Sequence, residues 1–210
     1  ISNVPDASKE QLDNAVASAR NAFKTWSTTP LAERQAAVAA IGQAIENHAE
    51  EFMALLTKEQ GKPRAGTEWE ILGSAAWCGE IAKQSLPDEQ VEDTADRSVI
   101  TRFSPLGVVG GIVPWNFPIL LAIWKIAPAL VTGNCIVIKP SPFTPLCTLK
   151  LGEVCQEILP PGVFSVVSGG DDLGKWMTTH KGINKIAFTG HTETGKHVMK
   201  SAADNLKRLT

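Results

Sequence analysis

Residues 106 to 118 read Leu-Gly-Val-Val-Gly-Gly-Ile-Val-Pro-Trp-Asn-Phe-Pro, an apolar segment that ends with an amide side chain between two prolines. A strand that ends at such a rigid turn and is followed by a helix brings its last side chains to the carboxyl edge of a sheet, where α/β folds bind ligands. Asn116 is the polar side chain that we expect at this edge.

Strands and helices alternate from this segment onward. The strands are short, apolar runs without polar alternation, which is typical of parallel sheets buried on both faces. The pattern predicts an α/β fold with a doubly wound, Rossmann-like parallel sheet. The expected strands are 106–113, 135–139, 163–167 and 185–188, and the expected helices are 118–131, 145–159, 173–179 and 192–203.

The chain before this region is predicted to be helical. Ser8 and Gln11 form a capping box ahead of the first helix, and Pro30 suits the first position of the second. A third helix is expected over 50–60, and a fourth over 66–85. After the acidic stretch 88–96, residues 97–103 alternate like a partly exposed strand.

The composition excludes several classes of function. The net charge is -2, and the sequence has no stripe of lysine or arginine that could bind nucleic acid. Partners should therefore be small molecules or protein. Residues 103–124 carry no charge, but Pro105, Pro114 and Pro118 argue against a membrane span. We see no signal peptide and expect a cytoplasmic protein.

The cysteines and histidines do not suggest a metal centre. The four cysteines form no CxxC pair, and the four histidines are scattered. We therefore predict neither zinc nor disulfides, as expected in the reducing cytosol.

Several polar or glycine-rich positions follow strand ends, and each has an ordinary alternative. Lys139 lies where a nucleotide ribose binds in such folds, but it could equally be a solvated lysine. The glycine-rich turns 168–174 and 188–195 could approach a pyrophosphate or be plain turns, since the second lacks GxGxxG. His191 could be a helix cap, and Asn116 a turn residue.

Six motifs together resemble the NAD(P)-dependent aldehyde dehydrogenase superfamily in order and spacing. They are Pro105 to Gly110, Pro114 to Pro118, Gly133-Asn134, Lys139 to Ser141, Pro161 to Val163, and Phe188 to Gly195. The resemblance implies an enzyme that oxidises a small aldehyde to a carboxylic acid with NAD or NADP, through a cysteine thiohemiacetal.

The resemblance also assigns roles to residues of this chain. Asn116 would donate its amide to the oxyanion, and Lys139 would bond the adenosine ribose. The other implied cofactor-binding residues are Ile112, Val113, Pro114, Trp115, Ser141, Gly170, Gly174, Phe188, Gly190, His191 and Thr194.

Two positions depart from the family pattern. Pro142 stands where NAD-preferring members usually carry a glutamate, so we expect NADP to be at least tolerated. His191 stands where a serine is common; an imidazole can still donate one hydrogen bond.

The resemblance divides the chain into a helical segment 1–96 packed on the cofactor domain, part of an oligomerisation hairpin at 97–104, and a dinucleotide-binding region at 105–210. The Leu-Glu-Leu-Gly-Gly motif with the general base and the nucleophilic cysteine belong to a catalytic domain that the resemblance places after Thr210. We therefore expect this chain to be inactive alone, and the complete protein to be a homodimer or homotetramer.

Two alternatives stay open. One is a non-catalytic nucleotide-binding or interaction module derived from this family. The other is an acylating or semialdehyde dehydrogenase within the superfamily.

Overall fold

The computed structural model describes all residues, 1–210, and has a five-stranded parallel sheet at its centre. The strand order is β5-β4-β3-β6-β7. The strands are β3 (Val108–Ile112), β4 (Cys135–Lys139), β5 (Phe164–Val166), β6 (Lys185–Phe188) and β7 (Arg208–Leu209). The predicted doubly wound α/β fold is therefore confirmed.

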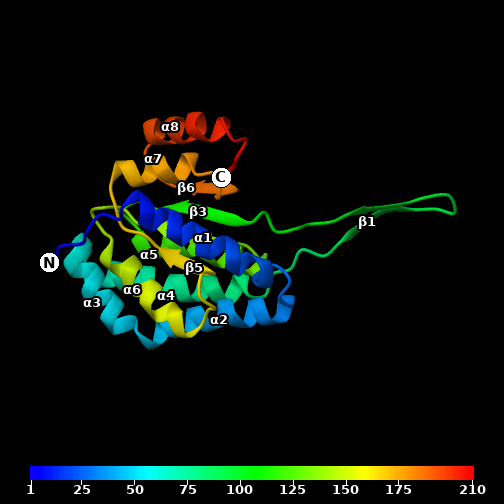
Figure 1. Ribbon diagram of the computed structural model, residues 1–210. Coiled ribbons are helices and arrows are strands. Elements are labelled where there is room, and N and C mark those ends of the chain that lie inside the picture. Colours follow the sequence, from blue (N-terminus) through cyan, green and yellow to red (C-terminus); the bar gives the residue numbers. More distant parts are fainter.

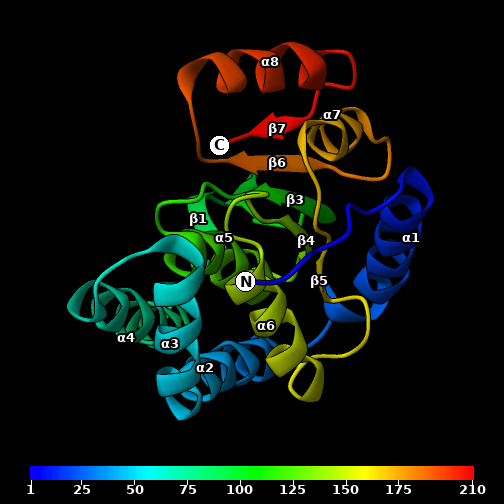
Figure 2. The same cartoon turned by 90° about the vertical axis from the view of Figure 1, so that its left-hand side faces the viewer.

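Helices cover both faces of the sheet (Figures 1 and 2). On one face lie α5 (Pro118–Val131) and α6 (Leu146–Val154), with α2 (Leu31–Asn47), α3 (Ala49–Gln60) and α4 (Arg64–Ile81) outside them. On the other face lie α1 (Lys9–Trp26), α7 (Asp171–Thr179) and α8 (Thr192–Ala203). None of these helices combines the length and apolar character that crossing a bilayer requires.

The core is continuous between the sheet and the N-terminal helices. One cluster of 40 buried residues joins strands β3 and β4 to side chains of α1 to α4, such as Leu12, Ile41, Phe52 and Ile71. Every residue of β4 is buried, as the uninterrupted apolar run Cys135 to Ile138 predicts.

The sheet register brings three strand ends side by side. Ile112 pairs with Lys139 on β4 and with Phe188 on β6. These residues are the last of their strands. Whatever follows each of them therefore emerges at one edge.

A two-stranded hairpin projects from the body of the molecule (Figure 1). It pairs β1 (Glu89–Asp93) with β2 (Ser98–Thr101). The acidic stretch 88–96, for which no strand was predicted, contains β1. Acidic residues are poor strand formers alone, but Gln90 Nε2 bonds across to Ser98 Oγ at 2.8 Å, and Glu92 pairs with Arg97.

The other element boundaries are close to prediction. The capping box at Ser8 is present, and helices 118–131 and 192–203 and strands 135–139 and 185–188 have the predicted bounds. The fourth helix is shifted: it begins directly after Pro63 and ends at Ile81, four residues before the predicted end. The helix expected over 145–159 stops at Val154 and continues as a 3₁₀ turn, η1 (Cys155–Glu157).

Candidate functional site

The candidate site lies where the strand order reverses, between β3 and β6. The chain leaves β3 toward β4 on one side and later returns to β6 on the other, which opens a crevice at the carboxyl edge. Backbone bonds extend the pairing past the strand ends: Val113 N donates to Lys139 O at 3.1 Å, and Thr189 N to Ile112 O at 3.1 Å. The three segments that follow the strands are thus fixed relative to one another.

Asn116 stands in the turn between β3 and α5. Its Oδ1 accepts a hydrogen bond from the backbone N of Phe117 at 3.1 Å, and the residue is exposed. The Nδ2 group makes no hydrogen bond within the chain, so its two protons are available to a ligand. Pro118 then begins α5, where its missing N–H costs nothing.

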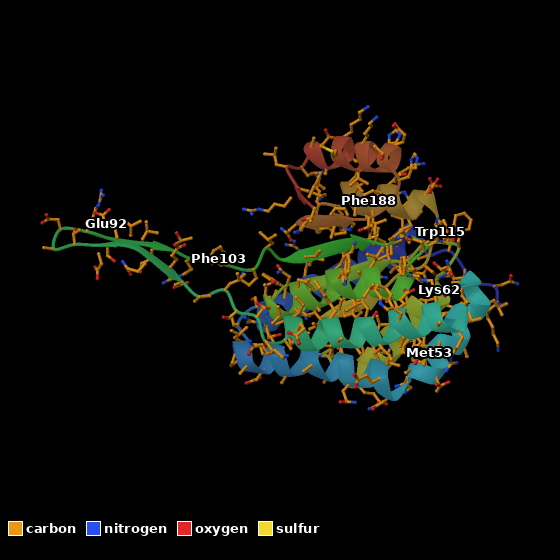
Figure 3. All side chains as sticks on the ribbon, turned by 180° about the vertical axis from the view of Figure 1, so that it is seen from behind. Met53, Lys62, Glu92, Phe103, Trp115 and Phe188 are labelled. Carbon is orange, nitrogen blue, oxygen red and sulfur yellow. The ribbon has the colours of Figure 1, made fainter.

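The turn and the strand ends lie at one end of the molecule. Figure 3 shows Trp115, Lys62 and Phe188 together at this end, far from Glu92 and Phe103 in the hairpin. Trp115 is exposed, whereas Val113 is buried and Ile112 and Pro114 are half-buried. These residues form a largely apolar wall beside Asn116.

Lys139 is a buried ammonium at the same edge. Its side chain is 6% exposed, and Nζ donates one bond, to Pro140 O at 3.1 Å. Burial lowers the pKa of Lys139, and the negative charges of Asp171 and Asp6 partly oppose this. An ammonium has three donors, so two are left for ligand hydroxyls.

Gly174 on α7 gives access to Lys139. A Cβ at this position would lie 3.8 Å from Lys139 Cε. The helix backbone therefore passes directly over the lysine side chain, and a larger residue would narrow the space beside the ammonium. Buried donors next to a bare backbone fit the hydroxyls of a ribose.

The turn after β6 fits a pyrophosphate. The ring of Phe188 packs on Gly190, where a Cβ would lie 2.7 Å from Phe188 Cζ. His191 is the N-cap of α8: its Nδ1 accepts from Glu193 N at 3.3 Å. The proton of a neutral ring is then on Nε2, and the amides of the first helical turn, with exposed Thr194, favour an anion.

Ser141 and Gly170 complete the set of sequence-based candidates. Ser141 is buried and its Oγ accepts from Phe143 N at 3.3 Å, so it also stabilises the turn after β4. Gly170 is the N-cap of α7, and a Cβ there would have only Asp6 Oδ2 nearby, at 4.0 Å. All of the candidates therefore lie at the carboxyl ends of β3, β4 and β6 or on the segments that leave β3, β4, β5 and β6.

Lys125 is a site residue that sequence reasoning missed. It lies on α5, and its Nζ donates to Thr189 Oγ1 at 2.6 Å, which links the helix to the segment after β6. Burial lowers its pKa to about 8. A lysine in this condition can hold or release a proton near neutral pH. No sequence signal connects Lys125 with Thr189.

None of the four cysteines has the properties of a nucleophile. All are buried and free. Burial raises the pKa of Cys78, Cys135 and Cys155 to about 12, and burial with the nearby Glu59 carboxylate raises that of Cys147 still further. Cys135 is a buried strand residue, and the cysteines of α6 and η1 face the core. No cluster of three or more His, Cys, Asp or Glu could hold a metal ion.

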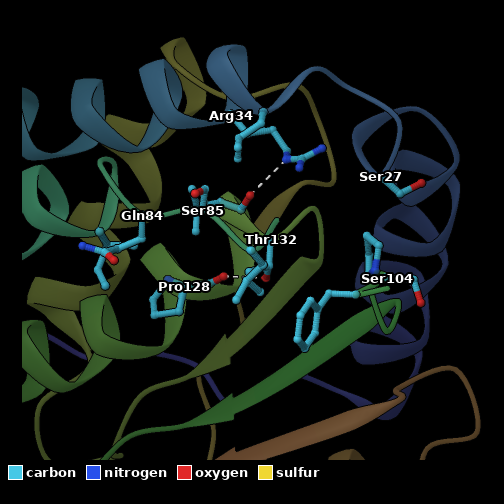
Figure 4. A pocket seen from close by; sticks show the side chains of 13 residues that line it. Ser27, Arg34, Gln84, Ser85, Ser104, Pro128 and Thr132 are labelled. Atoms are coloured by element: carbon cyan, nitrogen blue, oxygen red, sulfur yellow. Dashed lines mark hydrogen bonds between the residues drawn. The ribbon is translucent and has the colours of Figure 1, made fainter. Parts of the chain in front are cut away.

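A separate cavity of about 430 Å³ lies near the base of the hairpin, beside the C-terminal end of α5 (Figure 4). Arg34, Gln84, Phe103 and Thr132 are among its lining residues. Arg34 Nε donates to Val131 O at 3.0 Å and so caps the end of α5. The cavity shares no residue with the candidate site.

Comparisons with known proteins identify relatives of this chain in sequence and in fold. The sequence pattern of the aldehyde dehydrogenase family matches residues 1–210. An aldehyde dehydrogenase of a Fusarium species, LUC3, is 43% identical over 207 residues, which is 99% of this chain and 44% of that protein. Betaine aldehyde dehydrogenase from Staphylococcus aureus, solved in complex with NAD+, is similar with a TM-score of 0.94 and 35% identity, over 98% of this chain and 42% of that one. The chain thus spans less than half the length of these relatives.

Proposed function

This chain belongs to the aldehyde dehydrogenase family, and we propose that it forms the cofactor-binding part of an enzyme that oxidises an aldehyde to a carboxylic acid with NAD or NADP. The observation that carries the proposal is the alignment of Ile112, Lys139 and Phe188 at one sheet edge, with the Asn116 turn beside them.

Each side chain has a defined task in this proposal. Lys139 donates its two remaining N–H groups to the adenosine ribose, and the first turn of α8 binds the pyrophosphate. The bound nicotinamide supplies a hydride acceptor. Asn116 donates Nδ2–H to the oxygen of the substrate as negative charge develops there, which typically contributes about 100- to 1000-fold in rate.

The choice between NAD and NADP depends on the segment after β4. Pro142 is exposed and brings no carboxylate to this segment. A carboxylate there would accept from the ribose 2′-hydroxyl and repel a 2′-phosphate. We therefore propose that NADP is tolerated.

Residues 1–210 alone should not turn over aldehyde. A thiolate is required for attack, and burial holds the four thiols of this chain in the protonated form. The remaining site groups bind and polarise but supply no nucleophile.

The hairpin is proposed to mediate assembly of the complete protein into a dimer or tetramer. Val91, Val99, Ile100 and Phe103 are each at least 40% exposed along it. An edge of this kind, with apolar side chains in solvent, is suited to pairing with another chain.

The experiment is a comparison of the full-length protein with residues 1–210 and with full-length Asn116→Ala. Propanal with NAD should give NADH only with the full-length protein, and Asn116→Ala should lower kcat by about 100-fold or more. Full activity of Asn116→Ala, or turnover by residues 1–210, would contradict the proposal.

A further inference from the structure

A buried ion pair between Lys62 and Glu70 contacts the turn that carries Asn116. Glu70 on α4 is 0% exposed, and its Oε2 pairs with Lys62 Nζ from the loop between α3 and α4. A carboxylate removed from water in this way is stable only if it is fully paired. Glu70 is therefore held in one position, with Lys62 fixed against it.

Glu70 also caps α5. Its Oε1 accepts from Ile119 N at 3.0 Å and from Leu120 N at 3.3 Å. The helix has no side-chain cap of its own, because its N-cap is Phe117. The carboxylate faces the positive end of the helix dipole and fixes where the helix begins, immediately after the Asn116 turn.

Lys62 makes two hydrogen bonds and one cation–π contact around the turn. Besides Glu70, its Nζ donates to the backbone O of Asn116 at 2.8 Å and lies 3.8 Å from the centroid of the Phe117 ring. The backbone O of Asn116 is therefore held by Lys62, and its side-chain Oδ1 by Phe117 N at 3.1 Å. Both oxygens are thus held by the turn, whereas the Nδ2 amide has no partner within the chain and is available to a ligand.

We propose that Lys62, held by Glu70, is a positioning residue that fixes the direction of the Asn116 amide toward the reacting oxygen. The inference rests on the proposed oxyanion role of Asn116. Lys62 does not touch substrate; it acts through the backbone of Asn116. Displacement of a catalytic group by about 1 Å can lower a rate by roughly 100-fold, so a loosened turn should be costly.

The charge-neutral double variant Lys62→Met/Glu70→Gln tests this in the full-length protein. The single variant Lys62→Met leaves a buried carboxylate without its partner and is at risk of not folding. In the double variant the amide oxygen can still accept from Ile119 and Leu120, while the bond to Asn116 O is lost. Arg64→Met is the matched control, because Arg64 pairs with Glu50 at the surface, at 2.6 Å.

Hydrogen exchange, steady-state kinetics with NAD binding, and a comparison in an Asn116→Ala background distinguish a positioning role from a general structural role. Hydrogen exchange of the Phe117 amide should be faster by about tenfold in the double variant and unchanged in Arg64→Met, because this amide is bonded to the Asn116 side chain and, unlike those of Ile119 and Leu120, not to Glu70. The double variant should lower kcat by about 10- to 100-fold with little change in the Kd for NAD. In an Asn116→Ala background, the same pair of substitutions should lower kcat by less than about threefold.

Equal losses in both backgrounds would overturn the proposal, since they would mean a general structural role. Unchanged exchange and unchanged kcat would overturn it as well. A wild-type protein that does not oxidise aldehydes would refute the proposed function alone, because hydrogen exchange would still report whether Lys62 holds the turn.

Discussion

The half-buried Lys125 should make the stability of this protein depend on alkaline pH. Its pKa falls from the ordinary value of 10.5 to about 8, because burial removes water from the ammonium. Below pH 8 both the folded and the unfolded chain carry the proton, and the full desolvation cost opposes folding. Between pH 8 and 10.5 the folded chain loses this proton first, so the cost shrinks, and above 10.5 it is gone.

The size of the effect follows from the gap between the two pKa values. At about 1.4 kcal/mol per pKa unit the gap corresponds to about 3 kcal/mol. Partial contact with solvent screens the charge, so we expect about 1–2 kcal/mol. The hydrogen bond from Lys125 Nζ to Thr189 Oγ1, at 2.6 Å, adds to the free energy of unfolding but does not change the sign of its pH dependence.

Urea unfolding of the wild type and of Lys125→Met between pH 7 and 10.5 measures how the free energy of unfolding depends on the charge of Lys125. From pH 7 to 10.5 the free energy of unfolding of the wild type should rise by about 1–2 kcal/mol relative to that of Lys125→Met. Lys200→Met, at an exposed position on α8, is the control: the difference in free energy of unfolding between it and the wild type should be the same at every pH. A Lys125→Met difference that stays constant with pH would refute the reasoning.

Three other predictions concern the thiols, a helix cap and the cofactor preference. In the folded chain the four buried cysteines should react with Ellman's reagent at pH 8 about 100-fold more slowly than in urea, and a thiol that reacts at the rate of free cysteine would contradict their burial. Glu59→Gln should lower the free energy of unfolding by about 1–2 kcal/mol in urea titrations, because Glu59 caps α6 by accepting from Leu146 N and from Cys147 N at 3.1 Å. The control Glu51→Gln removes a surface ion pair and should lower the free energy of unfolding by less than about 0.5 kcal/mol. Equal losses in the two variants would argue against a stabilising role of the Glu59 cap. Pro142→Glu in the full-length protein should raise the ratio of NADP to NAD dissociation constants by about tenfold, and an unchanged ratio would show that this position does not face the ribose.

The sheet could be predicted from the sequence because its signals are local. Pro118 sets the start of α5, and the uninterrupted run Cys135 to Ile138 is explained only by a strand buried on both faces. The strand β1 was missed since its acidic residues gain their stability from β2, across the hairpin. The two-residue strand β7 is too short to give a pattern.

The polar contacts that support the site could not be predicted in this way. Glu70 caps a helix that begins 48 residues later, and Glu59 likewise caps α6. Either carboxylate looks in sequence like an ordinary helix residue, because its partner is determined only by how the helices pack. The same holds for Lys125, which the sequence shows only as a charge within an apolar helix.

The central claim is that the carboxyl ends of β3, β4 and β6 form a dinucleotide site next to Asn116. Isothermal titration of the full-length protein with NAD tests it most directly, with Lys139→Met compared with Lys175→Met, whose lysine pairs with Asp172 at the surface of α7. We predict saturable binding that Lys139→Met weakens by about tenfold or more, from the loss of charge-assisted bonds to the ribose, and that Lys175→Met leaves unchanged. Equal affinity of the wild type and Lys139→Met, or no saturable binding of NAD or NADP, would contradict the claim.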